Sequence, residues 1–207
     1  MLQIRAFNTE RTQMSTEKQK IAILAWGSLL WEERPEFNEQ HEKEWYFDGP
    51  VLNLEFSRKS SSRQGALTLV IDDINGTPTQ VAWCLSIRQS VEDAICDLRC
   101  REGTTLRNIR SIRLPTDSSS SPCPIIATWA SEKYLDAVIW TALESNFNGD
   151  GRPDFSVNAA VEYIKTLDPC GKSMAAEYIW RAPAFVKTPL RDALQQEPWF
   201  SLAKPLV

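Results

Sequence analysis

Several residue patterns that mark whole classes of protein are missing from this chain. Its 207 residues include a single histidine, His41, and no two of its five cysteines form a Cys-x-x-Cys pair. Because zinc sites need several Cys or His ligands at close spacing, we predict no metal. Ser-His-Asp and Cys-His mechanisms are also disfavoured, since the one histidine stands in a polar, charged stretch. Any catalysis should therefore use a carboxylate, and the cysteines should be free thiols.

Long apolar runs and basic blocks are missing as well. No apolar run approaches the roughly 20 residues that a membrane helix needs. The net charge is −4, without the clusters of Lys and Arg that phosphate binding requires. We therefore expect neither a membrane nor a nucleic acid as a partner. The polar first 20 residues lack the apolar core of a secretory signal, which predicts a cytoplasmic protein.

What the chain does have is an ordinary globular composition. Hydrophobic residues make up 43% and charged residues 24%, and 207 residues are enough for one substantial core. We expect a flexible tail over residues 1–20, one domain over residues 21–182, and an extension punctuated by prolines over residues 183–207. No internal repeat interrupts this organisation.

Strand patterns dominate the first half of the chain and helix patterns the second. Residues 51–56 alternate apolar and polar side chains, and residues 66–71 form a denser β run. Between the latter and a partner strand over 80–87, Asn75-Gly76 predicts a hairpin turn. The other predicted elements are strands over 108–114 and 124–129 and helices over 131–146, 156–167 and 173–181. Together they predict an α+β fold, a small, mixed, mostly antiparallel β-barrel or sheet with flanking helices.

The loop over residues 146–154 imitates a calcium site. Asn146, Asn148 and Asp150 stand at positions one, three and five of an EF-hand loop, followed by Gly151 at position six. The twelfth position, however, holds Val157 where a bidentate glutamate is needed. Turn formation explains the Asn, Asp and Gly residues equally well, so we predict no calcium.

The most informative stretch is Ala22-Ile23-Leu24-Ala25-Trp26-Gly27-Ser28-Leu29-Leu30-Trp31. A short apolar strand breaks at Gly27, where a positive φ is allowed and the missing Cβ lets a ligand approach the backbone. If the N–H groups of Gly27, Ser28 and Leu29 converge, they form a cradle for an anion or an oxyanion. The alternative is a plain corner between a strand and a loop.

Residues 90–103 are typical of one helix with an unusual end. Ser90 is a good N-cap and Gly103 a natural C-terminal stop. The apolar stripe reaches Leu98, and one further step of four places Glu102 on the same inward face. Burial and the carbonyl end of the helix both disfavour a negative charge there, and the resulting raised pKa suits a general acid or base. Alternatively, the helix frays and Glu102 pairs in solvent with Arg99, Arg101 or Arg107.

The order of these segments resembles the γ-glutamylcyclotransferase-like superfamily, especially its glutathione-degrading ChaC-type branch. The family's Tyr-Gly-Ser-Leu loop corresponds to Trp26-Gly27-Ser28-Leu29, and its catalytic Arg-Glu to Arg101-Glu102. Between them, residues 49–58 and 63–65 resemble its Arg/Phe/Ser-containing strand and following loop. The resemblance covers residues 21–114, and more loosely extends to 167. It departs at Trp26, which replaces a tyrosine, and after Gly103, where the family's tyrosine is missing.

The resemblance implies an enzyme that cyclises a γ-glutamyl peptide or γ-glutamylamine to 5-oxoproline and releases an amine, as in glutathione metabolism. Glu102 would be the general acid/base, and no cofactor or metal would be required. The implied partner is a small γ-glutamyl molecule, and the chain is compatible with a homodimer. We expect the substrate to be bound by Trp26, Gly27, Ser28, Leu29 and Leu30. Trp31 and Phe56 would form further walls of the pocket. Arg58 or Arg63 would bind a carboxylate of the substrate.

Two readings from other classes remain open. In the first, the same fold is a catalytically inactive module that binds a small metabolite. In the second, the chain is an oligomerisation or scaffold domain without a pocket ligand, for which eight tryptophans leave room.

Overall fold

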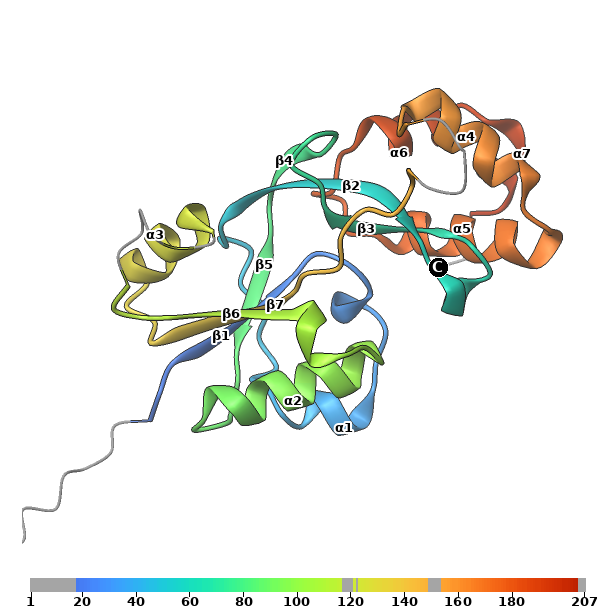
Figure 1. The fold of residues 1–207 in the computed structure, drawn as a ribbon. Helices are drawn as coiled ribbons and strands as arrows, with labels where there is room; N and C mark the ends of the chain where they lie inside the picture. Colours follow the sequence, from blue (N-terminus) through green and yellow to red (C-terminus); the bar gives the residue numbers. More distant parts are fainter. Residues whose placement is uncertain (1–17, 117–120, 122, 149–153, 205–207) are drawn as a thin grey trace, which may run out of the picture.

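Two β-sheets form the centre of the computed structural model, which describes residues 18–116, 121, 123–148 and 154–204 (Figure 1). One sheet has four strands in the order β5-β1-β7-β6, and the other has three in the order β3-β2-β4. The strands are β1 (Ile21–Ala25), β2 (Val51–Lys59), β3 (Leu67–Ile71), β4 (Thr77–Gln80), β5 (Ala82–Leu85), β6 (Ile109–Arg113) and β7 (Ala137–Thr141).

Helices surround these sheets. The α-helices are α1 (Pro35–Asn38), α2 (Val91–Glu102), α3 (Pro124–Glu132), α4 (Val157–Thr166), α5 (Pro169–Arg181), α6 (Pro189–Gln195) and α7 (Pro198–Leu202). The described residues also form the short 3-10 helices η1 (Ser28–Leu30), η2 (Ser61–Arg63) and η3 (Leu106–Asn108). Within the described residues, none of the helices is both long and apolar enough to cross a membrane.

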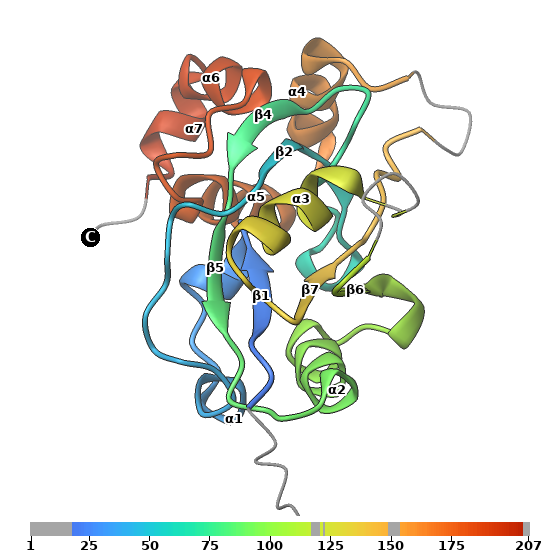
Figure 2. The ribbon, with the colours of Figure 1, turned by 90° about the vertical axis from the view of Figure 1, so that its left-hand side faces the viewer.

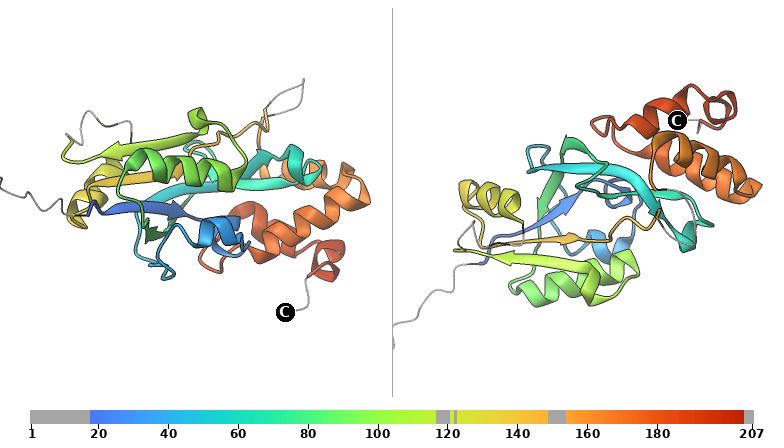
Figure 3. Two further views of the ribbon diagram at one scale, coloured as in Figure 1. Left: turned by 90° about the horizontal axis from the view of Figure 1, so that it is seen from below. Right: turned by 45° about the horizontal axis from the view of Figure 1, so that its top comes forward.

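The four-stranded sheet separates two hydrophobic cores. Its central strands β1 and β7 run parallel and are buried on both faces, as an apolar run without alternation requires. Along β1 the side chains point alternately to the two sides: Ile21 and Ile23 join α1 and α2, whereas Ala22 and Leu24 join the second sheet. In Figure 3, α2 lies along β1, β7 and β6.

The remaining helices complete the larger core on the other side. Helix α3 packs against β7, and α4 to α7 gather beside the three-stranded sheet (Figures 1 and 2). Helices α6 and α7 belong to the predicted extension over residues 183–207, and each begins at a proline, where the missing N–H costs no bond. Their side chains Leu190, Leu194 and Phe200 are fully buried. The extension therefore contributes to the core.

The α+β class and most predicted elements are confirmed. Strands are present at 51–56, 66–71 and 108–114, and helices at 90–103 and 156–167, while α5 begins four residues before the predicted 173. Of the alternatives barrel and sheet, the described part of the chain forms two sheets and no closed barrel. The predicted tail over residues 1–20 lies almost wholly outside the described residues.

The predicted hairpin is wrong, because β3 does not pair with the strands that follow it. Strand β2 lies between β3 and β4, with Leu54 opposite Ile71 on one side and Thr77 on the other. The Asx turn at Asp72 leads the chain across β2, and a Cβ on Gly76 would lie 2.5 Å from the carbonyl carbon of Asn53. Gly76 therefore serves a close crossing of the backbone.

Two further predictions were wrong, because a helix lies where a strand was expected and a strand where a helix was expected. Residues 124–129, predicted as a strand, lie in α3, where Pro124 starts the helix and the buried Ile126 and Ala130 are one turn apart. Residues 131–146, predicted as a helix, contain β7, whose residues 137–140 are all buried. A strand buried on both faces has no alternation and cannot be told from a buried helix by periodicity.

Glu55 offers a test of how this fold responds to pH. The side chain is fully buried on β2 beside α6, and burial raises its pKa to about 7, which hydrogen bonds from Thr188 and the Phe56 amide oppose only in part. Because the folded pKa exceeds the unfolded value near 4.5, the folded state binds more protons between these values, and stability falls as pH rises from 4.5 to 7.

We expect Glu55→Gln to remove this loss, which is roughly 3 kcal/mol at 1.36 kcal/mol per pKa unit. Urea unfolding at several pH values from 4.5 to 8 would measure it as a difference between variant and wild type that grows with pH. The exposed Glu36, changed to Gln, is the matched control. Parallel curves for wild type and Glu55→Gln would show that Glu55 titrates normally.

Candidate active site

A cavity of about 170 Å³ opens at the carboxyl ends of the two parallel strands. Residues 24–29 enter it from the end of β1, and Thr141 and Leu143 from the end of β7. Its opposite wall is formed by η2, by residues 68–70 of β3 and by Tyr178 of α5. Such a crevice beyond the carboxyl ends of parallel strands is a common ligand site in α/β sheets. Glu102, Arg34 and Arg63 also line it.

The C-terminal end of α2 carries Glu102 into the cavity. Gly103 adopts a left-handed conformation with φ of 58°, and the N–H groups of Gly103 and Thr104 donate to the carbonyls of Cys100 and Arg99. This Schellman motif ends the helix cleanly after Glu102, so the predicted alternative of a frayed helix is wrong. The Glu102 side chain is 20% exposed. Arg101 is more deeply buried, at 2%, so the inward stripe continues through Arg101 rather than through Glu102 alone.

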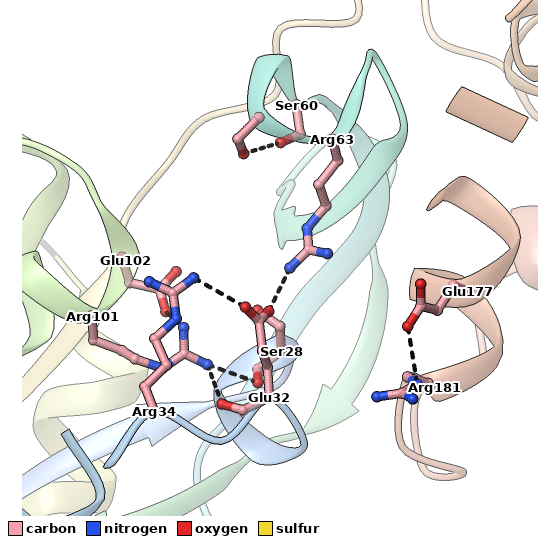
Figure 4. Close-up of polar contacts among 10 residues, drawn as sticks. Ser28, Glu32, Arg34, Ser60, Arg63, Arg101, Glu102, Glu177 and Arg181 are labelled. Atoms are coloured by element: carbon pink, nitrogen blue, oxygen red, sulfur yellow. Dashed lines mark hydrogen bonds and ion pairs between the residues drawn. The ribbon is translucent and has the colours of Figure 1, made fainter. Parts of the chain in front are cut away.

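The buried side chain of Arg101 holds the loop after β1 in place. Its Nη2 donates to the carbonyl oxygens of Ser28, at 3.0 Å, and Glu32, at 2.8 Å (Figure 4). A guanidinium buried against these two carbonyls fixes the first residue of the short turn η1 and the chain two residues beyond its end. From the sequence, Arg101 was considered as the first residue of the Arg-Glu motif and as a solvent partner of Glu102, but not as a support for this loop. The signal that identifies it is its position three residues after Leu98 on the buried stripe.

Gly27 is required because the Tyr178 hydroxyl approaches its backbone closely, and not because it adopts the positive φ that the sequence suggested. Its φ is −119°, which any residue can adopt, but a Cβ at this position would lie 2.7 Å from Oη of Tyr178. The space beside Gly27 therefore belongs to the tyrosine hydroxyl. Leu30 donates its N–H to the Gly27 carbonyl at 3.0 Å, so this amide closes the turn and is not available to a ligand. Among the described residues, the amide of Leu29 donates to no backbone carbonyl.

Tyr178 is the main residue of the cavity that sequence analysis missed. It lies on the inward face of α5, 5% exposed, with Trp31 and Phe56 edge-on to its ring. Burial and the neighbouring charge of Glu102 raise its pKa to about 12, so its hydroxyl stays protonated at neutral pH. In the sequence, the only signal for Tyr178 is the helical spacing of the apolar residues around it. That spacing is equally typical of a tyrosine in the core.

Positive charge prevails at the mouth of the cavity. The carboxylate of Glu32 binds Nη2 of Arg34 at 3.0 Å and Nη2 of Arg63 at 2.6 Å (Figure 4). Burial opposes ionisation of Glu32, but these two hydrogen bonds hold its pKa below the usual value. The Arg63 guanidinium also lies 4.9 Å from the centre of the Tyr178 ring. With Arg101, three arginines face two carboxylates, which favours an anionic ligand.

Glu102 has the electrostatics of an acid or base. Burial raises its pKa, and the charge of Glu32 adds to this rise. The guanidinium groups of Arg101 and Arg34 act in the opposite direction, with Arg101 Nη1 lying 3.9 Å from Glu102 Oε1. The net direction is upward, so Glu102 can exchange protons closer to neutral pH than an exposed glutamate can.

The structure brings most of the predicted binding residues to the cavity. Trp26, Gly27, Ser28 and Leu29 line it together with Glu102, and so does Arg63. The other predicted residues do not. Leu30 and Trp31 line a neighbouring hollow, Phe56 is fully buried behind Tyr178, and Arg58 donates to the carbonyl of Glu144 at 2.6 Å.

Residue types that bind metals do not cluster among the described residues. Nowhere in them do three or more His, Cys, Asp or Glu side chains gather as a metal would require. The calcium-like loop lies partly outside the described residues. Its described asparagines bind the protein itself, Asn146 Oδ1 accepting from the Lys59 amide and Asn148 Oδ1 from the Phe155 amide.

Comparison with known proteins gives no relative: no family model matches this chain, and no curated protein matches it either.

Proposed function

We propose that this protein is a γ-glutamylcyclotransferase-type enzyme, which converts a γ-glutamyl amide to 5-oxoproline and an amine. The observation that carries this proposal is Glu102, a carboxyl with a raised pKa at the end of α2, in one cavity with the loop after β1. The excess of arginine over carboxylate there suits a substrate with a free α-carboxylate. We regard the two-sheet arrangement as a variant of the γ-glutamylcyclotransferase-like fold.

The reaction needs orientation and proton transfer rather than an external nucleophile. The α-nitrogen of the substrate, freed of one proton by the Glu102 carboxylate, attacks the γ-carbonyl carbon of the same molecule. A C–N bond closes the five-membered ring, and the bond to the leaving nitrogen breaks. The two protons that the α-ammonium loses finally reside on the leaving amine, which Glu102 protonates. Because both reacting groups belong to one molecule, holding them in an attacking geometry supplies much of the acceleration.

Two groups in the cavity suit the charges of this reaction. Developing negative charge on the γ-carbonyl oxygen is stabilised by N–H donors that are already fixed in position. The amide of Leu29 in η1 is a suitable donor, since Arg101 holds this turn in place, whereas the Ser28 amide already donates to the Tyr178 hydroxyl. Arg63, at the mouth of the cavity, suits the α-carboxylate of the substrate. The protonated hydroxyl of Tyr178 lies beside Gly27.

A cytoplasmic setting also belongs to this proposal. All five cysteines are free thiols, which is typical of a reducing compartment. The partner in this proposal is a small γ-glutamyl molecule.

We expect 5-oxoproline to be released from at least one member of a panel of γ-glutamyl dipeptides, glutathione and γ-glutamylamines. Mass spectrometry would detect both 5-oxoproline and the free amine in equal amounts. The rate should rise with pH along an acid limb that lies above the usual pKa of a glutamate, since Glu102 must lose its proton to act as a base. Thermal stabilisation by these compounds without product would instead indicate an inactive binding module.

A further inference from the structure

A second hollow, of about 530 Å³, adjoins the cavity and shares Leu29 and Glu32 with it. Its other walls come from the segment before, within and after α1, and they include Trp31, Trp45 and His41. The ring of Trp31 packs edge-on against Tyr178 at 5.3 Å, so it connects the walls of the two spaces. A molecule whose γ-glutamyl part fills the cavity has this hollow as its neighbour.

His41 is a nearly buried residue in the wall of this hollow. The residue is only 8% exposed, and its ring lies between Phe37 and Trp45, at centroid distances of 4.9 and 5.2 Å. Its Nδ1 lies 2.6 Å from the carbonyl oxygen of Glu42, which can only accept, so Nδ1 carries the proton. In the neutral ring Nε2 is then an acceptor, and within the described residues it has no donor.

The charges around the hollow are the reverse of those in the cavity. Glu33 and Glu39 line it, and neither carboxylate forms an ion pair within the described part of the chain. Against them stands a single lining cation, Lys43. Two indole rings add faces that attract cations. Acceptors, carboxylates and indoles together favour an ammonium group and disfavour a carboxylate.

We propose that the second hollow binds the amine part of the substrate, and that this amine carries a second, cationic ammonium group at its far end. The inference rests on the proposed function and narrows it: the substrate class becomes mono-γ-glutamyl diamines and related cationic amines. A leaving group with its own carboxylate, such as an amino acid or a dipeptide, would meet Glu33 and Glu39. The catalytic step is unchanged, and the free diamine leaves through the hollow.

Three γ-glutamyl amides of equal chain length would test this selectivity. Their leaving amines are 1,4-diaminobutane, butylamine and 4-aminobutyrate, which end in an ammonium, a methyl and a carboxylate group. We expect kcat/KM to be about tenfold higher for the diamine derivative than for the neutral one, and lowest for the anionic one, given the size of a cation–π contact and screened charges. Equal values for the three, or a preference for the carboxylate, would overturn the proposal.

Two glutamates on the same short segment allow a local effect of the subsite to be distinguished from an effect of the overall charge. Glu39→Gln removes a lining charge and should lower the ratio of the diamine to the butylamine derivative about threefold. Glu36→Gln changes an exposed glutamate of α1 that does not line the hollow, and should leave this ratio unchanged. An equal effect of both variants would mean that only the overall charge matters.

Binding of the free amines distinguishes the failure of this inference from that of the proposed function. Calorimetry with 1,4-diaminobutane and butylamine needs no turnover, and it should show tighter binding of the diamine that weakens in Glu39→Gln. Such binding without any release of 5-oxoproline would support the diamine subsite and contradict the proposed enzymatic activity. Turnover of the panel without a preference for the diamine derivative would support the activity and contradict the subsite.

Discussion

Glu102→Gln is expected to fold normally and to lose about 10³-fold in kcat on the best substrate of the panel. General acid–base catalysis by one placed side chain typically contributes 10²–10⁴-fold. Gln keeps the shape and hydrogen-bonding capacity of the side chain but can neither take a proton from the α-ammonium nor give one to the leaving nitrogen. Binding should change little, because the proposed contacts with the substrate carboxylate come from the arginines rather than from Glu102. Single-turnover measurement of 5-oxoproline would separate the chemical step from product release.

Folding provides the internal check for this variant. The desolvation that raises the pKa of Glu102 penalises only the ionised form, so an uncharged amide at this position should not lower the melting temperature at pH 8. Glu92→Gln is the matched control, since Glu92 lies in the first turn of the same helix with its side chain 71% exposed. Full activity in Glu102→Gln would remove Glu102 from the mechanism, and an equal loss in both variants would point to damage to α2.

Local patterns were sufficient to predict the elements that carry the proposed chemistry. The helix over residues 90–103 is defined by Ser90 and Gly103, and both behave as predicted: the Ser90 hydroxyl accepts from the Asp93 amide, and Gly103, which lacks a Cβ, takes a left-handed conformation. The loop after β1 was marked by Gly27 alone. In the helix, the informative residues act within a few positions of their own place in the chain, so the local sequence contains the whole signal. In the loop, by contrast, the contact that requires a glycine is with the distant Tyr178.

Contacts between distant segments were not predictable in the same way. Tyr178 reaches Gly27 across 151 positions, and no local pattern distinguishes it from a core residue. The hairpin prediction was wrong for the same reason. Asn75-Gly76 specifies a turn but not which strands pair on either side of it, and β2 lies between β3 and β4. In β7, four consecutive buried residues removed the alternation that marks a strand. The arginine network joins three segments that lie far apart in the sequence, with Arg34 at the start of α1, Arg63 in η2 and Arg101 in α2.

Gly27→Ala is expected to lower kcat/KM about 100-fold, and Tyr178→Phe in the same chain should restore part of this loss. A Cβ on residue 27 would lie 2.7 Å from Oη of Tyr178, and the ring of that buried tyrosine is held by edge contacts with Trp31 and Phe56. The loop must shift instead, and a displacement near 1 Å at a reacting group can cost about 10²-fold. Removing the hydroxyl leaves Cζ as the nearest atom, at 3.9 Å, which is an ordinary contact.

The double-mutant cycle tests the contact without assuming what Tyr178 does for the substrate. Tyr178→Phe alone measures any loss of the hydroxyl as a donor, and the double variant then measures whether that loss adds to the loss in Gly27→Ala. We expect strong coupling, with the double variant more active than Gly27→Ala alone, and melting temperatures that follow the same order. Additive losses would mean that the alanine is accommodated elsewhere, and that Gly27 is needed for a substrate approaching its backbone rather than for the tyrosine beside it. The cycle therefore decides whether this glycine serves the fold or the ligand.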